Sequence, residues 1–570
     1  MLKILRINLG SEEVKEEMVE KGSRYEKVAG KALISSIIIN EIPAKDAPLA
    51  PSNKLIISCG FLSGTAVPNS GKISIGGKSP LTGGVKESNV GGRAPWFIAR
   101  MGLRAVIIEE IAKEWKILIL EEGTARLESA NDIIGKNNYD TVAHLLQKYG
   151  ERVGIFSIGI AGEKMLKGAS IASCDLEGYP SRHAGRGGLG ALMGSKKLKA
   201  IVVLPPKENK IEYYDKDSFV SNAKEWFKER HDATRWFSKL GTNAGLALIN
   251  EHYGLPVKNF RFGRFDAVEK ISGEAINAMI TQRNGKCGIP CSYGCAISCS
   301  NIYLGADGKH ITSSLEYETV AMNGPNLLID DLDLIAQLDH LEDDLGLDSI
   351  ETGAALGVLM EAGVIPWGNE GGRKALEILP KISQNDELAF ALGNGSVEVG
   401  RKYNISRVPA AKGQAFPAYD PRSFKGMGVT FATTPMGADH TAGAAVYGRK
   451  AYSSKEYGNV DDPAHKIELS TELQIFNYIM DCMGMCYFVG PSYENSIKLA
   501  KFINWYYGWN IDENFLIKMA KEMLVKERTY NIEAGLPKTN SLPEFFKEPI
   551  PGTNRTFNIN QEELDSVWKE

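Results

Sequence analysis

The sequence predicts an α+β protein in which a β-rich N-terminal domain is followed by two mainly helical domains. Three observations predict this order. Short β-rich runs alternate with glycine turns up to residue 206. Pro205, Pro206 and the charged run KENK then mark a boundary. Beyond it the apolar residues recur with helical spacing, so we expect domains over residues 1–206, 207–410 and 411–570.

The first domain contains six segments that we expect to form strands, because each is rich in Ile, Leu and Val and is bounded by turn residues. They are KLIIS at 54–58, KISIGG from Lys72, RAVIIEE from Arg104, WKILILEE from Trp115, VGIFSIG from Val153 and LKAIVVLP from Leu198. Helical patterns intervene at about 27–40, 95–101 and 137–149. This domain is therefore mainly sheet, with a few helices to cover it.

The second and third domains carry longer helical patterns. One begins at Asp217, and another runs from Leu332 to Gly363. Asp331 or Asp333 can cap the helix that we expect to end near Leu345, and Gly346 stops it. In the third domain a glycine-rich loop at 424–447 precedes helices near 468–483, 493–507 and 512–526.

Composition excludes several classes of protein. The 570 residues carry a formal charge of −4, with neither a basic tract nor an acidic tail, so we expect no nucleic-acid partner. The first residues lack the apolar run and cleavage site of a secretory signal. No stretch approaches the roughly twenty apolar residues of a spanning helix, so we expect no membrane association and a cytoplasmic location.

Four of the eight cysteines lie within KCGIPCSYGCAISCS, residues 286–300. Three interpretations are open: a buried helix face, a structural zinc site, or part of an iron-sulphur cluster. Gly288, Pro290 and Gly294 break helical continuity. Zinc usually uses two distant C-x2-C pairs, whereas every gap here is x3, which favours an iron-sulphur cluster whose last ligand lies elsewhere. The candidates for that ligand are Cys59, Cys174, Cys482 and Cys486.

Two glycine clusters lie in the first domain, KSPLTGGVKESNVGGR from Lys78 and HAGRGGLGALMGSKKLKA from His183. Glycines allow backbone N–H groups to approach an anion, and Arg93 and Arg186 bring positive charge close by. The glycines could equally serve as ordinary turns. Because two such clusters occur in one domain, phosphate or pterin binding is as strong a hypothesis as ordinary turns.

One motif occurs twice. Asp343 to Asp348 reads DDLGLD and Asp481 to Cys486 reads DCMGMC, and each closes an apolar-periodic helix. A carboxylate at such a point can accept hydrogen bonds from a flat heterocycle that carries amino groups, such as a pterin. The alternative is a pair of ordinary helix ends with glycine. The second copy ends in a cysteine, so it could supply the missing thiolate.

Together these motifs resemble the tungsten-containing aldehyde ferredoxin oxidoreductase family. The resemblance rests on KSPLTGG with SNVGG, GRGGLGALMGSKKLKA, the cysteine cluster, DDLGLD, AAKGQAFPAYDPR, GADH and DCMGMC, in the family's order and nearly from end to end of the chain. It implies a three-domain subunit whose β domain is the base for a tungsten ion held by two pterins. It also implies a 4Fe-4S cluster and a magnesium ion that bridges the pterin phosphates.

The resemblance assigns residues to the cofactor. The two pterin rings would be bound by Asp343 and by Asp481. Gly346, Leu347 and Asp348 of the first motif would take part beside Asp343. The residues that would approach the phosphates and magnesium are Asn89, Gly91 and Gly92 on one side and Arg186, Gly187 and Gly188 on the other. Lys72 stands where the family would have an arginine near the cofactor.

For the cluster, the family uses C-x2-C-x3-C followed by a distant cysteine at the end of the second D-x-x-G motif. This chain departs from that spacing. The expected ligands are Cys291, Cys295, Cys299 and Cys486, with Cys287 as a substitute for one of the local three.

The catalytic pair follows from the chemistry and the resemblance together. Aldehyde oxidation needs a base for a proton and a donor to the carbonyl oxygen. Glu318 in SLEYETVAMNG aligns with the family's active-site glutamate, and His440 in MGADH aligns with its histidine. Without the resemblance, Glu318 would be a surface residue beside Glu316, and His440 a satisfied core histidine.

The leading hypothesis is an oxidoreductase that converts aldehydes to carboxylic acids and passes electrons through the cluster to ferredoxin. Two alternatives are a family reductase of another substrate, such as an aromatic thioester, in a larger electron-transfer complex, and a non-catalytic scaffold stabilised by zinc. Met436 stands before GADH where the family commonly has an arginine. The chain has no E-x-x-H motif for an iron-bridged dimer, so a homodimer through other contacts and a dedicated electron-transfer subunit both stay open.

Overall fold

The computed structural model describes residues 2–446 and 457–569. The strands are β1 (Lys3–Asn8), β2 (Glu13–Met18), β3 (Leu55–Cys59), β4 (Ile73–Lys78), β5 (Val85–Val90), β6 (Leu103–Glu109), β7 (Lys116–Glu121), β8 (Thr124–Ser129), β9 (Gly154–Ser157), β10 (Ile171–Ser173), β11 (Arg182–Ala184), β12 (Leu198–Val203), β13 (Lys286–Ile289), β14 (Ser300–Leu304), β15 (His310–Ser313), β16 (Ala410–Ala411) and β17 (Gln414–Ala415).

The α-helices are α1 (Gly30–Glu41), α2 (Ala94–Arg100), α3 (Asn138–Tyr149), α4 (Ile160–Glu163), α5 (Leu189–Ser195), α6 (Lys216–Leu240), α7 (Leu246–Glu251), α8 (Gly273–Gln282), α9 (Tyr317–Asn323), α10 (Leu332–Leu345), α11 (Ser349–Glu361), α12 (Asn369–Ile378), α13 (Glu387–Gly393), α14 (Ser396–Tyr403), α15 (Lys425–Thr433), α16 (Lys466–Met483), α17 (Tyr493–Tyr507), α18 (Glu513–Glu533) and α19 (Gln561–Ser566). The expected order, a β-rich N-terminal region followed by helices, is confirmed. None of the helices within the described ranges is long and apolar enough to cross a membrane.

The chain folds into two compact units. The first unit contains Met1–Thr234, Pro290–Ile297 and Ile475–Leu536. The second contains Arg235–Ile289, Ser298–Gln474 and Pro537–Glu570. The cysteine-rich stretch is therefore divided between them, and each unit is described in turn.

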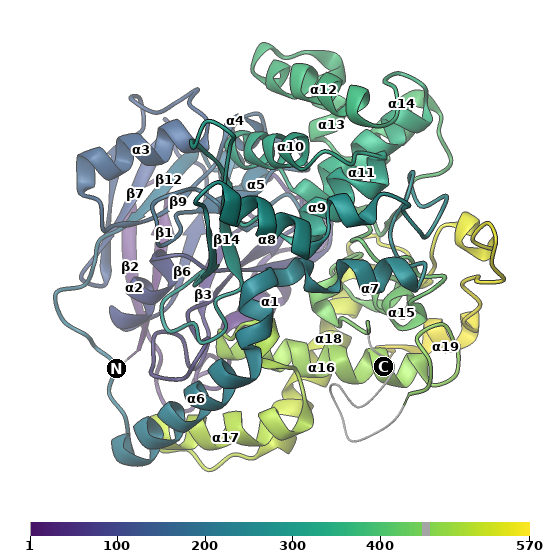
Figure 1. Cartoon of the computed structure of the whole chain (residues 1–570). Helices are drawn as coiled ribbons and strands as arrows, with labels where there is room; N and C mark the ends of the chain where they lie inside the picture. The colour runs from purple at the N-terminus through teal and green to yellow at the C-terminus, as the bar shows by residue number, and fades with distance from the viewer. Residues whose placement is uncertain (1, 447–456, 570) are drawn as a thin grey trace. The chain divides into compact units, whose positions relative to one another are not determined.

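The first unit is built on two six-stranded mixed sheets, in the orders β2-β1-β6-β3-β4-β5 and β11-β10-β9-β12-β7-β8. Their strands are drawn in purple and blue (Figure 1). Alternate residues of each buried strand point to opposite faces, so one strand serves two cores. Ile56 and Ile107 pack under α1, whereas Ile57 and Ile108 join the core shared with the second sheet. Helix α3 covers the far face of that second sheet.

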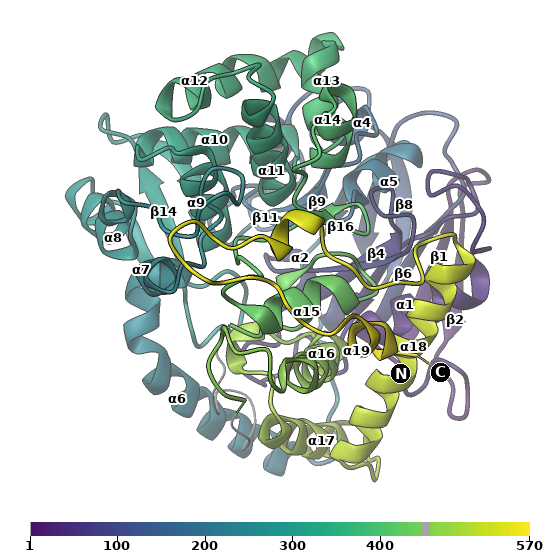
Figure 2. The same ribbon diagram turned by 90° about the vertical axis from the view of Figure 1, so that its right-hand side faces the viewer.

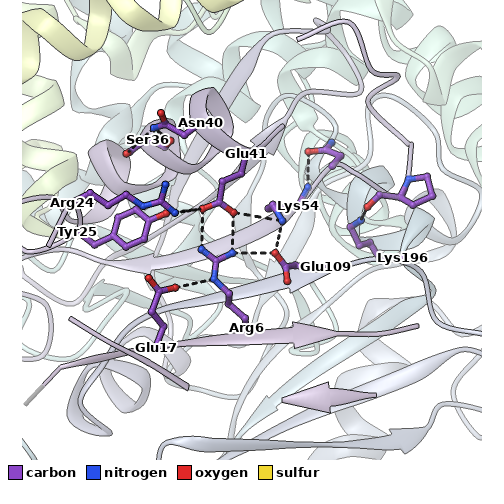
Figure 3. A network of polar contacts seen from close by, with 12 residues as sticks. Arg6, Glu17, Arg24, Tyr25, Ser36, Asn40, Glu41, Lys54, Glu109 and Lys196 are labelled. Carbon is purple, nitrogen blue, oxygen red and sulfur yellow. Dashed lines mark hydrogen bonds and ion pairs between the residues drawn. The ribbon is translucent and has the colours of Figure 1, made fainter. Parts of the chain in front are cut away.

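A polar network fixes β1, α1, β3 and β6 to one another (Figure 3). The Arg6 guanidinium donates to both oxygens of Glu41 at 2.9 Å and to Glu109 at 3.1 Å, and Lys54 also pairs with Glu109. The Tyr25 hydroxyl donates to Glu41 at 2.6 Å. Burial acts to raise the pKa of Glu41, but these hydrogen bonds outweigh it and hold the pKa at about 2. The network therefore favours an ionised Glu41 and fixes the C-terminal end of α1.

The second unit is mainly helical, with a three-stranded antiparallel sheet, β13-β14-β15. Helices α10 to α14 lie together (Figure 2). Helix α11 is buried over most of its length. A Cβ added at Gly353 would lie only 2.9 Å from the Met322 carbonyl oxygen, so glycine allows this close packing. Glu351 on α11 is 1% exposed, yet it accepts hydrogen bonds from Ser396 and from the Ala415 N–H. These bonds satisfy the buried carboxylate and join α11 to α14 and β17.

One local expectation was wrong. Residues 425–433, expected within a glycine-rich loop, form helix α15, and residue 447 at the end of that loop lies outside the described residues. Gly426 and Gly428 are needed because Ala445 and Phe557 pack against the helix where a Cβ would stand. Both glycine clusters include strand residues: β5 runs through the first cluster, and β11 ends in the second.

Candidate cofactor and active site

The two D-x-x-G motifs fold as equivalent helix ends. In the first copy the Gly346 N–H donates to the Asp343 carbonyl at 3.2 Å, and the Leu347 N–H donates to the Glu342 carbonyl at 2.8 Å. Gly346 has a φ of 74°, in the left-handed region that glycine adopts without strain. This is the Schellman arrangement, which ends α10 and satisfies two of the last carbonyl groups of the helix.

The second copy repeats these bonds at the end of α16. The Gly484 N–H donates to the Asp481 carbonyl at 3.3 Å, the Met485 N–H donates to the Met480 carbonyl at 3.1 Å, and Gly484 has a φ of 72°. The repeat is therefore structural as well as sequential. Lys31 on α1 adds a charge that the sequence did not reveal: it is 3% exposed, and its Nζ lies 3.9 Å from Asp481 Oδ2.

Buried carboxyl groups surround the first motif. Burial and the charge of Asp343 raise the pKa of Asp339, and burial and the charge of Asp339 raise the pKa of Glu342. Asn323 donates to one Glu342 oxygen at 2.8 Å, while the other oxygen is buried without a partner among the described residues. A protonated carboxyl at this place can donate a hydrogen bond to a heterocycle.

The motifs differ at their sixth position. Asp348 is the N-cap of α11 and accepts from the Ile350 N–H at 3.0 Å, so part of its hydrogen-bonding capacity serves the helix. Cys486 instead donates its N–H to the Asn69 carbonyl at 3.0 Å. The two copies thus present a carboxylate in one case and a thiol in the other.

Asn69 connects the cysteine segments of the first unit. Besides the contact to Cys486, its N–H donates to the Gly294 carbonyl at 2.9 Å, and its side chain accepts from the Ala296 N–H at 3.2 Å. Its amide donates to Cys295 Sγ at 3.4 Å. Asn69 is 1% exposed with a φ of 61°. No local pattern marks Asn69, since its partners lie more than two hundred residues away.

Replacing Asn69 by glycine is expected to lower the iron content of the purified protein, or to speed iron loss in air, because the contacts to Cys295 and Ala296 disappear. Glycine keeps the left-handed backbone free of strain. Asn385 is the matched control, since it has a φ of 58° on an exposed turn. Iron assay after anaerobic purification checks this, and equal iron in Asn69→Gly, Asn385→Gly and the unmodified protein would remove Asn69 from the site.

The surroundings of Cys291 favour the thiolate form. A hydrogen bond from Cys295 holds the pKa of Cys291 well below its usual range against the effect of burial, and the charges of Lys72 and Arg182 act in the same direction. Cys287 in the second unit differs, because burial raises its pKa despite a hydrogen bond from Asn277. These environments favour Cys291 over Cys287 as a ligand.

Cys287 and Cys299 border the same narrow pocket of the second unit. Within residues 2–446 and 457–569, no three or more His, Cys, Asp and Glu side chains gather as they would around a single ion. In a 4Fe-4S cluster each cysteine binds a different iron, so its ligands are spread around the cluster.

The glycine clusters form a cradle in the first unit. A Cβ on Gly91 would stand 3.0 Å from both Lys72 Nζ and the Cys291 carbonyl, so Lys72 reaches both the turn and the cysteine segment. The Asn89 amide nitrogen is buried without an acceptor among the described residues, which fits a phosphate oxygen. The Gly92 N–H, in contrast, already donates to the Cys291 carbonyl at 2.9 Å and is not available to a phosphate.

The second cluster meets the first. The Arg186 N–H donates to the Ser88 hydroxyl at 3.3 Å, and the Gly187 carbonyl accepts from the Ser79 hydroxyl at 2.7 Å. Gly187 and Gly188 have φ values of 84° and 77°, and Lys86 fills the space where a Cβ on Gly187 would stand. Arg186 is 7% exposed. The two clusters therefore form one buried, positively charged region, as anion binding requires.

Glu318 and His440 lie together in the second unit. His440 Nε2 is 3.6 Å from Glu318 Oε1. The other Glu318 oxygen accepts from the Ala418 N–H at 2.8 Å, and the Tyr317 hydroxyl donates to the Ala418 carbonyl at 2.5 Å. His440 Nδ1 is buried and has no partner among the described residues. The backbone thus holds the Glu318 carboxylate beside the imidazole of His440, whose Nδ1 keeps its hydrogen-bonding capacity.

Two family models cover nearly the whole chain. "Aldehyde ferredoxin oxidoreductase, N-terminal domain" matches residues 4–205, and "Aldehyde ferredoxin oxidoreductase, domains 2 & 3" matches residues 218–570. A tungsten-containing aldehyde ferredoxin oxidoreductase of Pyrococcus furiosus is 31% identical, over 99% of this chain and 94% of its own length.

One further relative and one solved structure of similar fold have other names. The WOR-like subunit of an aliphatic sulfonate oxidoreductase from Pyrococcus furiosus is 27% identical over 100% of this chain and 93% of its own length. Among solved structures, the active site complex BamBC of benzoyl coenzyme A reductase has a chain with a TM-score of 0.80 at 18% identity, covering 99% of this chain and 92% of that one. This last similarity shows a common fold.

Proposed function

The chain belongs to the aldehyde ferredoxin oxidoreductase family, and from this premise we propose that it oxidises aldehydes to carboxylic acids. The observation that carries the proposal is the pair Glu318 and His440. They are 122 positions apart in sequence (440 − 318), yet their side chains lie 3.6 Å from each other. A base beside a hydrogen-bond donor is the minimum that this reaction asks of the protein.

We assign the cofactor of the family, a tungsten bis-pterin group, to the residues that fit it. Asp343 and Asp481 would accept hydrogen bonds from the two pterin rings, and their equivalent helix ends support this. The Asn89 amide and the region around Arg186 would receive the phosphates, where we also place magnesium. Gly91 keeps the turn open to the cofactor, and Lys72 adds a positive charge beside it.

The cluster assignment is Cys291, Cys295, Cys299 and Cys486. The lowered pKa of Cys291 and the contacts of Asn69 to both cysteine segments support it. Electrons would leave through this 4Fe-4S cluster to ferredoxin or to a dedicated electron-transfer subunit. Because Asp481 and Cys486 share one turn, pterin binding and cluster binding are mechanically linked.

In the reaction, the tungsten group supplies two-electron oxygen-transfer chemistry when it is bound. The conversion of an aldehyde and water to a carboxylic acid releases two electrons and two protons, and Glu318 Oε1 would take one of these protons. His440 donates a hydrogen bond to the carbonyl oxygen of the aldehyde and so orients the substrate. The Ala418 N–H holds Glu318 in place throughout.

The division into three domains, over 1–206, 207–410 and 411–570, also belongs to this proposal. The gap between the two family matches, from 205 to 218, supports the first boundary. All eight cysteines are free, which supports a reducing compartment such as the cytoplasm. A homodimer is compatible with the family assignment.

An anaerobic assay with aldehydes and an artificial electron acceptor tests the function. Acid formation at a rate proportional to the metal content of the preparation is the expected result. The same preparation is tested for reduction of an aromatic thioester with a strong reductant. Thioester reduction without aldehyde oxidation would overturn the proposal and favour a reductase in a larger complex.

A further inference from the structure

A cavity of about 530 Å³ lies in the first unit, where the end of α17 meets the segment before α6. None of the residues proposed above for cofactor, cluster or catalysis lines it. Its volume falls within the range of about 300–1,000 Å³ that is typical of small-molecule sites. Five aromatic side chains line it: Tyr213, Tyr214, Tyr506, Tyr507 and Trp509.

Arg104, on β6, lines the same cavity and has an unusual environment. It is 2% exposed, and no carboxylate among the described residues forms an ion pair with it. It donates one hydrogen bond, to the Tyr507 hydroxyl at 3.0 Å, and its Nε is buried without an acceptor. Its guanidinium lies 5.1 Å from the centre of the Phe61 ring and 5.5 Å from that of Tyr507.

These contacts leave Arg104 incompletely compensated. Contacts with two rings offset part of the cost of burying a cation. A buried charge without an anionic partner is still unfavourable, and unused guanidinium donors are well suited to a carboxylate. The wall of the cavity therefore carries a ready binding point for an anion.

The aromatic side chains form a continuous cluster beside this arginine. The rings of Tyr506 and Tyr507 lie 4.4 Å apart and are tilted by 55°, and those of Tyr507 and Trp509 lie 4.6 Å apart and are stacked, at an interplanar angle of 20°. Burial raises the pKa of Tyr506 and of Tyr507, so both phenols stay neutral and do not repel an anion. Flat rings at such spacing suit a flat ligand.

The charges around the cavity nearly balance. Lys21 and Lys210 are basic, and Glu26 and Glu212 are acidic. One Glu26 oxygen already accepts from the Gly22 N–H at 2.8 Å. These four side chains cancel, and Arg104 leaves one positive charge, which matches a ligand with a single negative charge.

We propose that this cavity binds an aromatic monocarboxylate, with the carboxylate on Arg104 and the ring among the tyrosines and Trp509. The site is separate from the proposed active site, and the inference does not depend on the proposed function. It is a binding site for a small molecule and includes no chemical step.

Calorimetric titration of the full-length holoprotein with 2-naphthoate and with uncharged 2-naphthamide tests the proposal. We expect 2-naphthoate to bind at least about tenfold more tightly than the amide, as a charge-assisted hydrogen bond implies. Arg104→Gln is expected to abolish this preference while leaving amide binding unchanged. Arg152→Gln, an exposed arginine of the same unit, is the matched control and keeps it.

Two further variants separate the explanations. Glu318→Gln keeps the full preference for 2-naphthoate if the ligand binds in this cavity. A changed preference in Glu318→Gln places the ligand in the active site and overturns the proposal. Tyr214→Ala is the second variant, for the case that Arg104→Gln does not fold, because the Tyr214 side chain is 79% exposed. It is expected to weaken the binding of both probes equally. Equal affinity of the unmodified protein for both probes, or no binding at millimolar concentration, contradicts the proposal.

Discussion

Replacing Glu318 by glutamine is expected to lower kcat for aldehyde oxidation by about two to four orders of magnitude, the usual contribution of a general base. The substitution keeps the size of the side chain and an oxygen that can accept from the Ala418 N–H. It removes the charge that faces His440 at 3.6 Å. Steady-state rates per tungsten, measured anaerobically, check this expectation.

The neighbouring Glu316 provides the control. It accepts a hydrogen bond from the Thr242 hydroxyl at 2.5 Å and precedes α9, so Glu316→Gln perturbs the same segment without touching the proposed base. Glu316→Gln is expected to keep most of the activity. Tungsten, iron and pterin contents are expected to be equal in both variants. A normal rate in Glu318→Gln would exclude Glu318 as the base.

Replacing Asp481 by alanine is expected to weaken pterin retention by about ten- to a hundredfold. The loss of hydrogen bonds to a charged acceptor costs about 1.5–3 kcal/mol. The backbone of the turn should persist, because its bonds from Gly484 and Met485 use carbonyl oxygens rather than the carboxylate. Pterin released by denaturation, quantified per chain, measures the effect.

Asp512→Ala is the matched control for this measurement. Asp512 also ends a loop of the first unit, where it caps α18 by accepting from the Phe515 N–H at 3.0 Å. Its removal is expected to cost about 1 kcal/mol of stability and no pterin. If Asp481→Ala holds as much pterin as Asp512→Ala, the Asp481 carboxylate has no part in binding the ring.

The sequence predicted the buried strands better than the edge strands. KLIIS and RAVIIEE correspond to β3 and β6, whose apolar residues serve the cores on both faces of their sheet. β2 was not predicted, because EVKEEM is an edge strand with exposed charges and little apolar signal. Helix α15 was also not predicted, but the reason is a different one. Its glycines suggested a loop, whereas close packing by Phe557 and Ala445 requires them.

Much of the candidate site could be proposed from motifs, and its supporting residues could not. Local patterns identified the two helix ends, and Gly346 and Gly484 adopt the left-handed conformation that such ends need. Lys31 and Asn69 carry no local signal. Their partners lie hundreds of positions away in sequence, and only the fold brings them to Asp481 and Cys486.

The most direct test of the central claim is the metal content of anaerobically purified protein. Tungsten, molybdenum, iron and zinc are counted per chain by elemental analysis. We expect one tungsten and about four irons, the content of one bis-pterin centre and one 4Fe-4S cluster. Zinc alone, in a preparation supplied with tungstate and iron during expression, would contradict the account and support a zinc-stabilised scaffold.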